Sequence, residues 1–382
     1  MSSILTADQQ ADFLKRGFSR RSFGRLATVL TAGATLPFYN EPALAQLSRV
    51  RNIPPDAVLI NANENPLGPC TAAAEAIYNV VKIGGRYNYD LTDGMTKTLA
   101  SIEGLKPDYV AAYAGSSLPL HTSVMAFTSP TRSLVIGDPG YEAGPRAAQF
   151  VGAKVIYVPL RKDGSHDVKA MLAADPNAGC FYLCNPNNPT GTLTPRADIE
   201  WLLSNKPAGS ILLLDEAYIH FSDAQHGSDL VAADKDIIIL RTFSKLYGMA
   251  GLRAGAALAR PDLLIKIRNY GSEMMPITGM VGADTSLKLK TLVPERASNL
   301  KAIRENTFAF LEKNNIPYMP SVSNCFMMDT KRPGMEFVKA MQGEKVYIGR
   351  VWKAWPTYAR VTVGTKEEMA KFQAATLKVY NA

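Results

Sequence analysis

The feature that most constrains the fold of this 382-residue chain is a series of short apolar segments separated by longer segments with helical patterns. The apolar segments are rich in Val, Ile, Leu or Tyr, and most end at Gly, Pro, Asn or Asp, as buried strands do. Strands that alternate with helices predict an α/β domain with a mostly parallel sheet, which binds ligands beyond the carboxyl ends of its strands. The segments are residues 109–114, 133–137, 154–160, 179–184, 210–214, 237–242 and 250–259.

The pattern changes after residue 260, where longer helical segments precede short strand-like ones. This change predicts a second, smaller α+β domain, and the chain length is sufficient for two or three domains. The expected helices are residues 261–270, 284–292, 294–314 and 366–380, and the expected strands are 325–329, 345–349 and 359–363.

The N-terminal 45 residues have the three-part layout of an export signal. Residues 19–26 carry basic side chains, residues 26–40 are uncharged, and a small-x-small site ends at Ala45. The pair Arg20-Arg21 followed by Phe23 resembles a twin-arginine signal, which predicts a periplasmic protein cleaved near Ala45. The apolar run is too short for a stable membrane anchor. The alternative is an amphipathic helix that happens to contain two arginines.

Charge and metal-ligand patterns exclude two classes of function. The net charge of +8 suits anionic ligands, but no basic run is interleaved with aromatic residues, so nucleic-acid binding is not expected. The four cysteines and four histidines lack the spacing of a metal site, and no metal is predicted. Buried free thiols are expected, although an oxidising compartment leaves a disulfide open.

The segment 241–255 places Lys245 directly after an apolar strand and inside a turn rich in hydroxyl side chains. Pyridoxal phosphate needs an amine with which to form its resting imine. Its phosphate needs hydroxyl and guanidinium donors, which Thr242, Ser244 and Arg253 can supply. The alternative for a single lysine is a solvated surface group.

Two further segments provide partners for the pyridine ring of this cofactor. Asp215 ends an apolar strand, where a carboxylate is costly unless it is paired, and the protonated ring nitrogen would be its partner. Asn188, in a loop stiffened by two prolines, and Tyr218 can hydrogen-bond the phenolic oxygen. The alternatives are a helix N-cap for Asp215 and a plain turn for the Asn-Pro segment.

A third segment, Gly115-Ser116-Ser117, follows the first expected strand and opens a helix. Small residues at this position expose backbone N–H groups to an anion, and Pro119 is compatible with the first helical turn. The alternative is a simple helix cap.

Taken in this order, the segments resemble the fold-type-I pyridoxal-phosphate enzymes of the class I/II aminotransferases, closest to the histidinol-phosphate aminotransferase branch, over residues 59–377. The resemblance implies a mainly parallel seven-stranded large domain and a smaller α+β domain. The implied parts are a signal (1–45), an N-terminal segment that joins the small domain (46–85), the large domain (86–265) and the small domain (266–382). The motifs are residues 63–69, 86–87, 188–191, 215–218, 242–253 and 360–365.

The resemblance also implies roles for individual residues. Lys245 would be the Schiff-base lysine and proton shuttle, and Asp215 would hold the pyridine nitrogen. Asn188 and Tyr218 would hold the ring oxygen, and Tyr141 would stack on the ring. The phosphate would be held by Gly115, Ser116, Ser117, Thr242, Ser244 and Arg253.

Substrate binding and assembly are implied in the same way. Arg360 would grip the α-carboxylate of the substrate, with Asn324, Arg350 and Asn65 near it. Tyr87 would reach the phosphate of a neighbouring subunit, which implies an obligate homodimer.

The predicted reaction is transfer of an amino group between an amino acid, or a related amine, and a 2-oxo acid. A decarboxylase or an oxidase on the same fold is the alternative enzyme. A periplasmic binding protein that lost the chemistry is the non-enzymatic alternative, against which the intact residue set argues.

The substrate is expected to differ from histidinol phosphate for two reasons. Leu67 stands where the Asn-Glu-Asn-Pro motif of the histidinol-phosphate enzymes usually continues with tyrosine. Histidine synthesis is also a cytoplasmic task, which does not suit an exported protein. Trp352 and Trp355 suggest an apolar or aromatic side chain, or they belong to the core.

Overall fold

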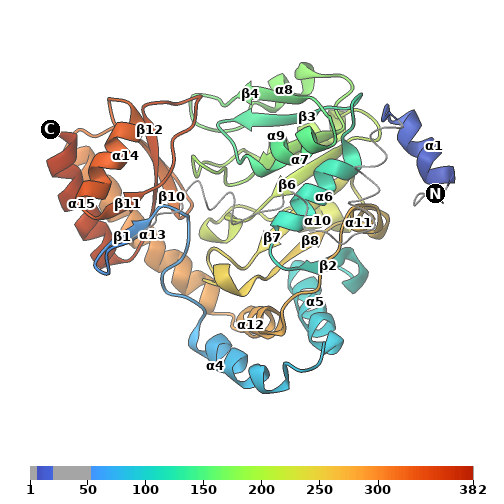
Figure 1. The fold of residues 1–382 in the computed structure, drawn as a ribbon, viewed down its shortest axis with the longest axis horizontal. Coiled ribbons are helices and arrows are strands. Elements are labelled where there is room, and N and C mark those ends of the chain that lie inside the picture. Colours follow the sequence, from blue (N-terminus) through green and yellow to red (C-terminus); the bar gives the residue numbers. More distant parts are fainter. Residues whose placement is uncertain (1–6, 20–52, 382) are drawn as a thin grey trace.

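The computed structural model describes residues 7–19 and 53–381 (Figure 1). The predicted export signal, including Arg20, Arg21 and Ala45, falls outside the described residues. Among the helices that are described, none has the length and apolar character needed to cross a membrane.

The centre of the fold is a seven-stranded sheet with the strand order β2-β8-β7-β6-β5-β3-β4. Only β8 runs against the other strands, because it pairs antiparallel with both β2 and β7. The predicted mainly parallel seven-stranded sheet is therefore confirmed. The strands are β2 (Val110–Tyr113), β3 (Leu134–Asp138), β4 (Val155–Pro159), β5 (Cys180–Cys184), β6 (Ile211–Asp215), β7 (Ile237–Thr242) and β8 (Gly255–Leu258).

The segment 250–259, expected as a single strand, is instead divided in two. Ala250–Leu252 forms a 3-10 turn (η4), Arg253 adopts a left-handed conformation with φ of 55°, and β8 begins only afterwards. The Arg253 guanidinium donates hydrogen bonds to the carbonyls of Ala250, at 2.8 Å, and Ala114, at 3.1 Å. These bonds hold the turn against the loop after β2, so the segment cannot extend.

A hydrophobic core lies on each face of the sheet. Leu212 and Leu214 on β6 contribute to one core and Leu213 to the other, because successive strand side chains point to opposite faces. The first face is covered by α6 (Ser117–Phe127), α7 (Ala143–Phe150) and α11 (Pro261–Arg268). The second is covered by α5 (Tyr89–Glu103), α8 (Val168–Ala174), α9 (Arg196–Asn205), α10 (Ser228–Ala232) and α12 (Ile277–Lys288). Short 3-10 turns are η1 (Val81–Ile83), η2 (Pro107–Tyr109) and η3 (Ile219–Phe221).

A third core lies in a smaller group of elements, at the left of Figure 1. There β1 (Val58–Ile60) pairs in parallel with β11 (Val346–Ile348), which brings the N-terminal segment to the C-terminal part of the chain. A capping box between Thr365 and Glu368 begins the last helix. The other elements of this group are β9 (Tyr318–Met319), β10 (Cys325–Asp329), β12 (Tyr358–Thr362), α13 (Leu292–Lys313), α14 (Gly334–Gly343) and α15 (Lys366–Tyr380). The helix α4 (Thr71–Val80) lies outside this group and packs on α12.

The first described helix, α1 (Ala7–Lys15), lies at the opposite edge of the molecule beside α11 (Figure 1). Phe13 and Phe18 are buried in the core that contains α6. Arg16 donates hydrogen bonds to the carbonyls of Met125, Ala126 and Thr128, at 3.0–3.1 Å. A cation at the C-terminal end of a helix satisfies carbonyls that have no partner within the helix. The opposite end of α6 opens into the cavity described next.

Candidate active site

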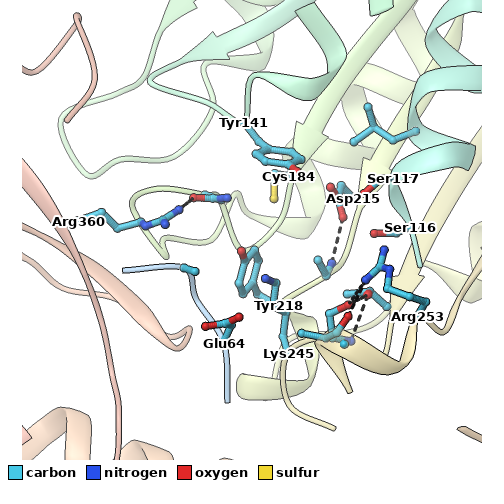
Figure 2. Close-up of a pocket in the computed structure, with 18 of the residues that line it drawn as sticks. Glu64, Ser116, Ser117, Tyr141, Cys184, Asp215, Tyr218, Lys245, Arg253 and Arg360 are labelled. Atoms are coloured by element: carbon cyan, nitrogen blue, oxygen red, sulfur yellow. Dashed lines mark hydrogen bonds between the residues drawn. The ribbon is translucent and has the colours of Figure 1, made fainter. Parts of the chain in front are cut away.

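A cavity of about 460 Å³ lies at the carboxyl ends of the parallel strands (Figure 2). Most of its walls come from the loops that follow these strands, and Arg350 and Arg360 from the C-terminal part close one side. Sequence motifs far apart in the chain therefore meet at one site, as expected for a parallel sheet. Residues lining the cavity that were predicted from the sequence are Ser116, Ser117, Tyr141, Asn188, Asp215, Tyr218, Thr242, Ser244, Lys245, Arg253, Arg350 and Arg360.

Lys245 projects from the turn after β7 toward the middle of the cavity (Figure 2). Its Nζ atom lies 5.9 Å from the centroid of the Tyr218 ring. The turn closes with a hydrogen bond from the Gly248 N–H to the Lys245 carbonyl. Gly248 has φ of 70°, and a Cβ there would lie 2.1 Å from the Gly68 carbonyl oxygen. Only glycine allows this approach, so the turn and the N-terminal segment hold the amine in place together.

Asp215 lies at the buried end of β6, with its carboxylate turned into the cavity. The Tyr182 hydroxyl donates to it at 2.9 Å and the Ala217 N–H at 3.1 Å. Burial raises the pKa of Asp215 to about 6, although these two donors and the charge of Lys245 partly oppose the rise. A carboxylate in this environment is poised to receive a protonated nitrogen from a ligand.

Replacing Asp215 with asparagine is expected to stabilise the ligand-free protein at neutral pH by about 1–2 kcal/mol. The folded-state pKa of about 6 exceeds the ordinary value of 3.8, so the folded protein binds the proton more tightly than the unfolded chain does. The contribution of Asp215 to wild-type stability should therefore fall as pH rises from about 3.8 to 6, so the stability advantage of D215N over wild type should grow across this range. Urea unfolding of both proteins across this pH range measures the difference. Parallel pH profiles would contradict it.

An anion-binding cradle surrounds the N-terminal end of α6. Ser116 and Ser117 open the helix, and the Thr242 hydroxyl donates to the Ser244 hydroxyl at 3.0 Å. The Arg253 guanidinium completes the group from the side of η4. Gly115 has φ of 95°, and a Cβ there would lie 2.2 Å from Arg253 Nη2. Helix N–H groups, two hydroxyls and a guanidinium form a donor set that suits a phosphate monoester.

Arg360 is a buried cation on the other side of the cavity. It donates to Asn188 Oδ1 at 2.9 Å and to the Asn61 carbonyl at 2.7 Å, while its Nε atom is buried without a hydrogen-bond partner. Burial and the nearby Arg350 lower its pKa. Within residues 7–19 and 53–381 no carboxylate forms an ion pair with Arg360. Because a buried charge is costly unless it is compensated, this position suits a ligand carboxylate.

Two tyrosine side chains and one asparagine amide complete the lining of the cavity between Asp215 and Arg360. Tyr141 and Tyr218 both project into the cavity (Figure 2). The Tyr218 hydroxyl accepts a hydrogen bond from Asn63 Nδ2 at 3.1 Å, which fixes its direction. Asn188 accepts from Arg360 through Oδ1, so its amide hydrogens are directed elsewhere. Phenol and amide donors in one cavity match the predicted contacts to a ring oxygen.

Four of the predicted site residues do not line the cavity. Gly115 lies directly behind it, against Arg253. Asn65 donates to the Leu246 carbonyl at 2.8 Å, and the buried Asn324 donates to the Asn63 carbonyl at 3.1 Å, so both support the N-terminal segment. Tyr87 is exposed on the surface.

Several residues that shape the site were not predicted from the sequence. Glu64 and Ala217 line the cavity, and each lies inside a motif whose neighbours were identified. Tyr182 bonds Asp215 from β5, where alternation along the strand places it on the same face as Cys184. Glu142 forms an ion pair with Arg350, and no signal in the sequence indicates this pairing.

The described residues contain no group of three or more His, Cys, Asp or Glu side chains that could hold a metal ion. All four cysteines lie in the described part of the chain, and each is a free thiol. The disulfide that the sequence left open is therefore not formed among them.

The family model described as aminotransferase class I and II matches residues 55–375. Histidinol-phosphate aminotransferase 1 of Nitrosococcus oceani is 31% identical over 358 residues, which cover 92% of this chain and 95% of the relative. The histidinol-phosphate aminotransferase of Moorella thermoacetica is 29% identical over 85% of this chain and 86% of the relative.

Solved structures share the fold. A protein of Erwinia carotovora atroseptica provisionally named histidinol-phosphate aminotransferase has 30% identity and a TM-score of 0.80, covering 84% of this chain and 95% of that chain. The histidinol-phosphate aminotransferase of Sinorhizobium meliloti in complex with pyridoxal-5'-phosphate has 23% identity and a TM-score of 0.76, covering 90% and 97%. At the latter identity the similarity demonstrates the fold alone.

Proposed function

We propose, from the premise that this chain belongs to the class I and II aminotransferase family, that its cavity binds pyridoxal phosphate covalently at Lys245. The chain is an aminotransferase, as the family match and the named relatives agree. Its substrates are small molecules, an amino acid and a 2-oxo acid. The observation that carries the proposal is that Lys245, Asp215 and the uncompensated Arg360 line one cavity.

The residues present fit this cofactor. The cradle of Ser116, Ser117, Thr242, Ser244 and Arg253 would hold its phosphate, and the raised pKa of Asp215 suits a contact to the ring nitrogen. When bound, pyridoxal phosphate supplies an electrophilic carbon and an electron-accepting ring. Asn188 and Tyr218 would bond the ring oxygen, and Tyr141 would stack on the ring.

The protein side of the reaction requires two further groups. The Arg360 guanidinium would bind the α-carboxylate of the incoming amino acid. That carboxylate supplies the counter-ion that Arg360 lacks in the described part of the chain. The Lys245 amine, once free of the cofactor, would take the proton from the substrate Cα and return it to a neighbouring carbon, acting first as base and then as acid. Its position in a turn fixed by Gly248 keeps Nζ within the cavity.

A product assay tests the reaction against the decarboxylase and oxidase alternatives. Single L-amino acids are mixed with the purified protein, and the matching 2-oxo acid, carbon dioxide and peroxide are each measured. Oxo acid formed together with amino transfer to a second 2-oxo acid supports the proposal. Carbon dioxide or peroxide in proportion to substrate consumed would replace it with one of the alternatives.

The homodimer remains a proposal, and an exposed apolar segment supports it. Residues 78–89 carry five large exposed hydrophobic side chains, including Tyr78, exposed by 73%, and Tyr87, exposed by 68%. Several large exposed apolar side chains within one short segment suit a protein–protein contact. A second copy of the chain would cover it and bring Tyr87 to the partner's phosphate cradle.

The double variant Tyr78→Asp/Val81→Asp is therefore expected to be monomeric, because two buried carboxylates would oppose the interface. Sedimentation velocity should show wild type at twice the chain mass of 41.5 kDa and the variant at that mass. Met335→Asp, an equally exposed apolar site on α14, serves as control and should leave the dimer unchanged. A monomeric wild type at micromolar concentration would contradict the proposal.

Export by the twin-arginine route is proposed from the sequence of residues 19–45. Replacing Arg20 and Arg21 together with lysine is expected to reduce the periplasmic fraction of the protein at least about tenfold. The conservative variant Arg25→Lys is the matched control, because it lies outside the arginine pair. Equal periplasmic fractions for all three proteins would overturn this proposal.

A further inference from the structure

Arg350 and Glu142 form an ion pair across the cavity wall. Arg350 follows β11 in the C-terminal part, and Glu142 is the residue immediately before α7 on the sheet side. Arg350 Nη2 and Glu142 Oε2 are 2.7 Å apart, and the two side chains are exposed by only 11% and 36%. The pair therefore connects two parts of the chain beside the substrate-binding cavity.

Trp352 fixes the position of this pair. Its indole N–H donates to the Gly140 carbonyl at 2.9 Å, two residues before Glu142. The Arg350 guanidinium lies 4.7 Å from the centroid of the Trp352 ring, and the Arg360 guanidinium lies 5.5 Å from it. Stacking on an aromatic face favours a fixed guanidinium, so Trp352 holds Arg350 at the cavity wall beside Glu142.

The two arginines of the cavity thus differ in charge balance. Arg360 has no carboxylate partner in the described part of the chain, whereas Arg350 is neutralised by Glu142. Glu64 adds a carboxylate to the cavity lining and forms no ion pair with any described residue. The binding surface can compensate one ligand anion at Arg360, and it offers no unpaired cation for a second one beside Arg350.

We propose that the Arg350–Glu142 pair determines substrate specificity by admitting substrates with a single anionic group, the α-carboxylate, and rejecting those with a second carboxylate or a phosphate. This inference rests on the proposed function of the cavity. A second anion that approached Arg350 would either displace Glu142 or lie beside it, and like charges in a partly buried site repel. The substrate class is amino acids whose side chain carries no negative charge.

Binding of two unreactive carboxylates tests the pair without requiring turnover. Succinate and butyrate have similar length, but succinate carries a second carboxylate. Calorimetric titration of the cofactor-loaded protein gives a dissociation constant for each, and wild type should bind butyrate at least as tightly as succinate. In Glu142→Gln the ratio of the succinate affinity to the butyrate affinity should rise at least tenfold, because Arg350 is then unpaired. Glu344→Gln, which removes one carboxylate from a surface pair with Lys378, should leave the ratio unchanged.

Two further variants separate the possible outcomes. Arg350→Gln should shift the ratio further from succinate, because Glu142 is left uncompensated. Arg360→Met should weaken both ligands, which identifies the site they occupy. The proposal is overturned if wild type already prefers succinate tenfold and Arg350→Gln abolishes that preference, if Glu142→Gln leaves the ratio within twofold, or if neither ligand binds wild type. If the product assay shows no amino transfer but Glu142→Gln still shifts the affinity ratio toward succinate, only the transamination reaction is rejected and the specificity proposal stands.

Discussion

Replacing Lys245 with alanine is expected to lower the rate of amino transfer at least about 10³-fold, because the change removes both the cofactor attachment and the group that moves the proton. The fold should survive. Lys245 projects into a cavity rather than into the packed core, so truncation of its side chain removes little packing.

Steady-state kinetics with the preferred amino donor measures this effect, and urea unfolding checks that the free energy of unfolding changes by less than about 1 kcal/mol. Lys290→Ala, on the exposed surface, is the matched control. A Lys245→Ala protein with more than about a tenth of wild-type activity would exclude the assigned role.

Replacing Arg241 with methionine is expected to lower the free energy of unfolding by about 3–5 kcal/mol, the largest stability effect that the structure predicts. Arg241 is buried between Glu103, which it contacts at 2.9 and 3.1 Å, and Glu216, with which it also forms an ion pair. Methionine would leave both carboxylates buried without a cation. Because Glu216 follows Asp215 and Arg241 precedes Thr242, the variant should also lose affinity for the cofactor.

The ion-pair network of Arg241, Glu103 and Glu216 makes the stability of the fold depend on pH in a known direction. Burial favours the protonated form of Glu103, but Arg241, His226 and Ser228 together hold its pKa well below the ordinary value of 4.5. The network therefore stabilises the wild-type fold above pH 4.5, and this stabilisation is lost as pH falls below that value. Urea unfolding of both proteins at several pH values measures this loss of stability.

Arg260→Met is the control for Arg241→Met, because it breaks an exposed pair with Asp262. It should lower the free energy of unfolding by at most about 1 kcal/mol. A similar small loss for Arg241→Met would contradict the account.

Much of the fold could be predicted because the sheet is buried on both faces. Each strand of such a sheet is a nearly continuous apolar run, and the runs ending near Cys184, Asp215 and Thr242 are β5, β6 and β7. The carboxyl ends of parallel strands meet at one edge, so the residues that follow them were expected to share a site, and they do. The division of residues 250–259 could not be predicted, because it depends on hydrogen bonds from Arg253 to two separate carbonyls.

The parts of the site that could not be predicted depend on contacts between segments that are far apart in the sequence. Glu142 and Arg350 are separated by 208 positions in the sequence and meet only because the C-terminal part packs against the sheet. Asn65 and Asn324 belong to motifs that were identified, but their amides bond the backbone outside the cavity. A motif therefore indicates which segment contributes to the site, while the direction of each side chain depends on tertiary packing.

Reduction of the cofactor-loaded protein with borohydride, followed by proteolysis and mass spectrometry, would identify the lysine that binds the cofactor. Borohydride converts a lysine-bound cofactor into a stable adduct, so the modified residue can be identified. We expect a pyridoxyl group on the peptide that contains Lys245 and on no other peptide. An adduct on a different lysine, or no adduct in protein supplied with pyridoxal phosphate, would contradict this expectation.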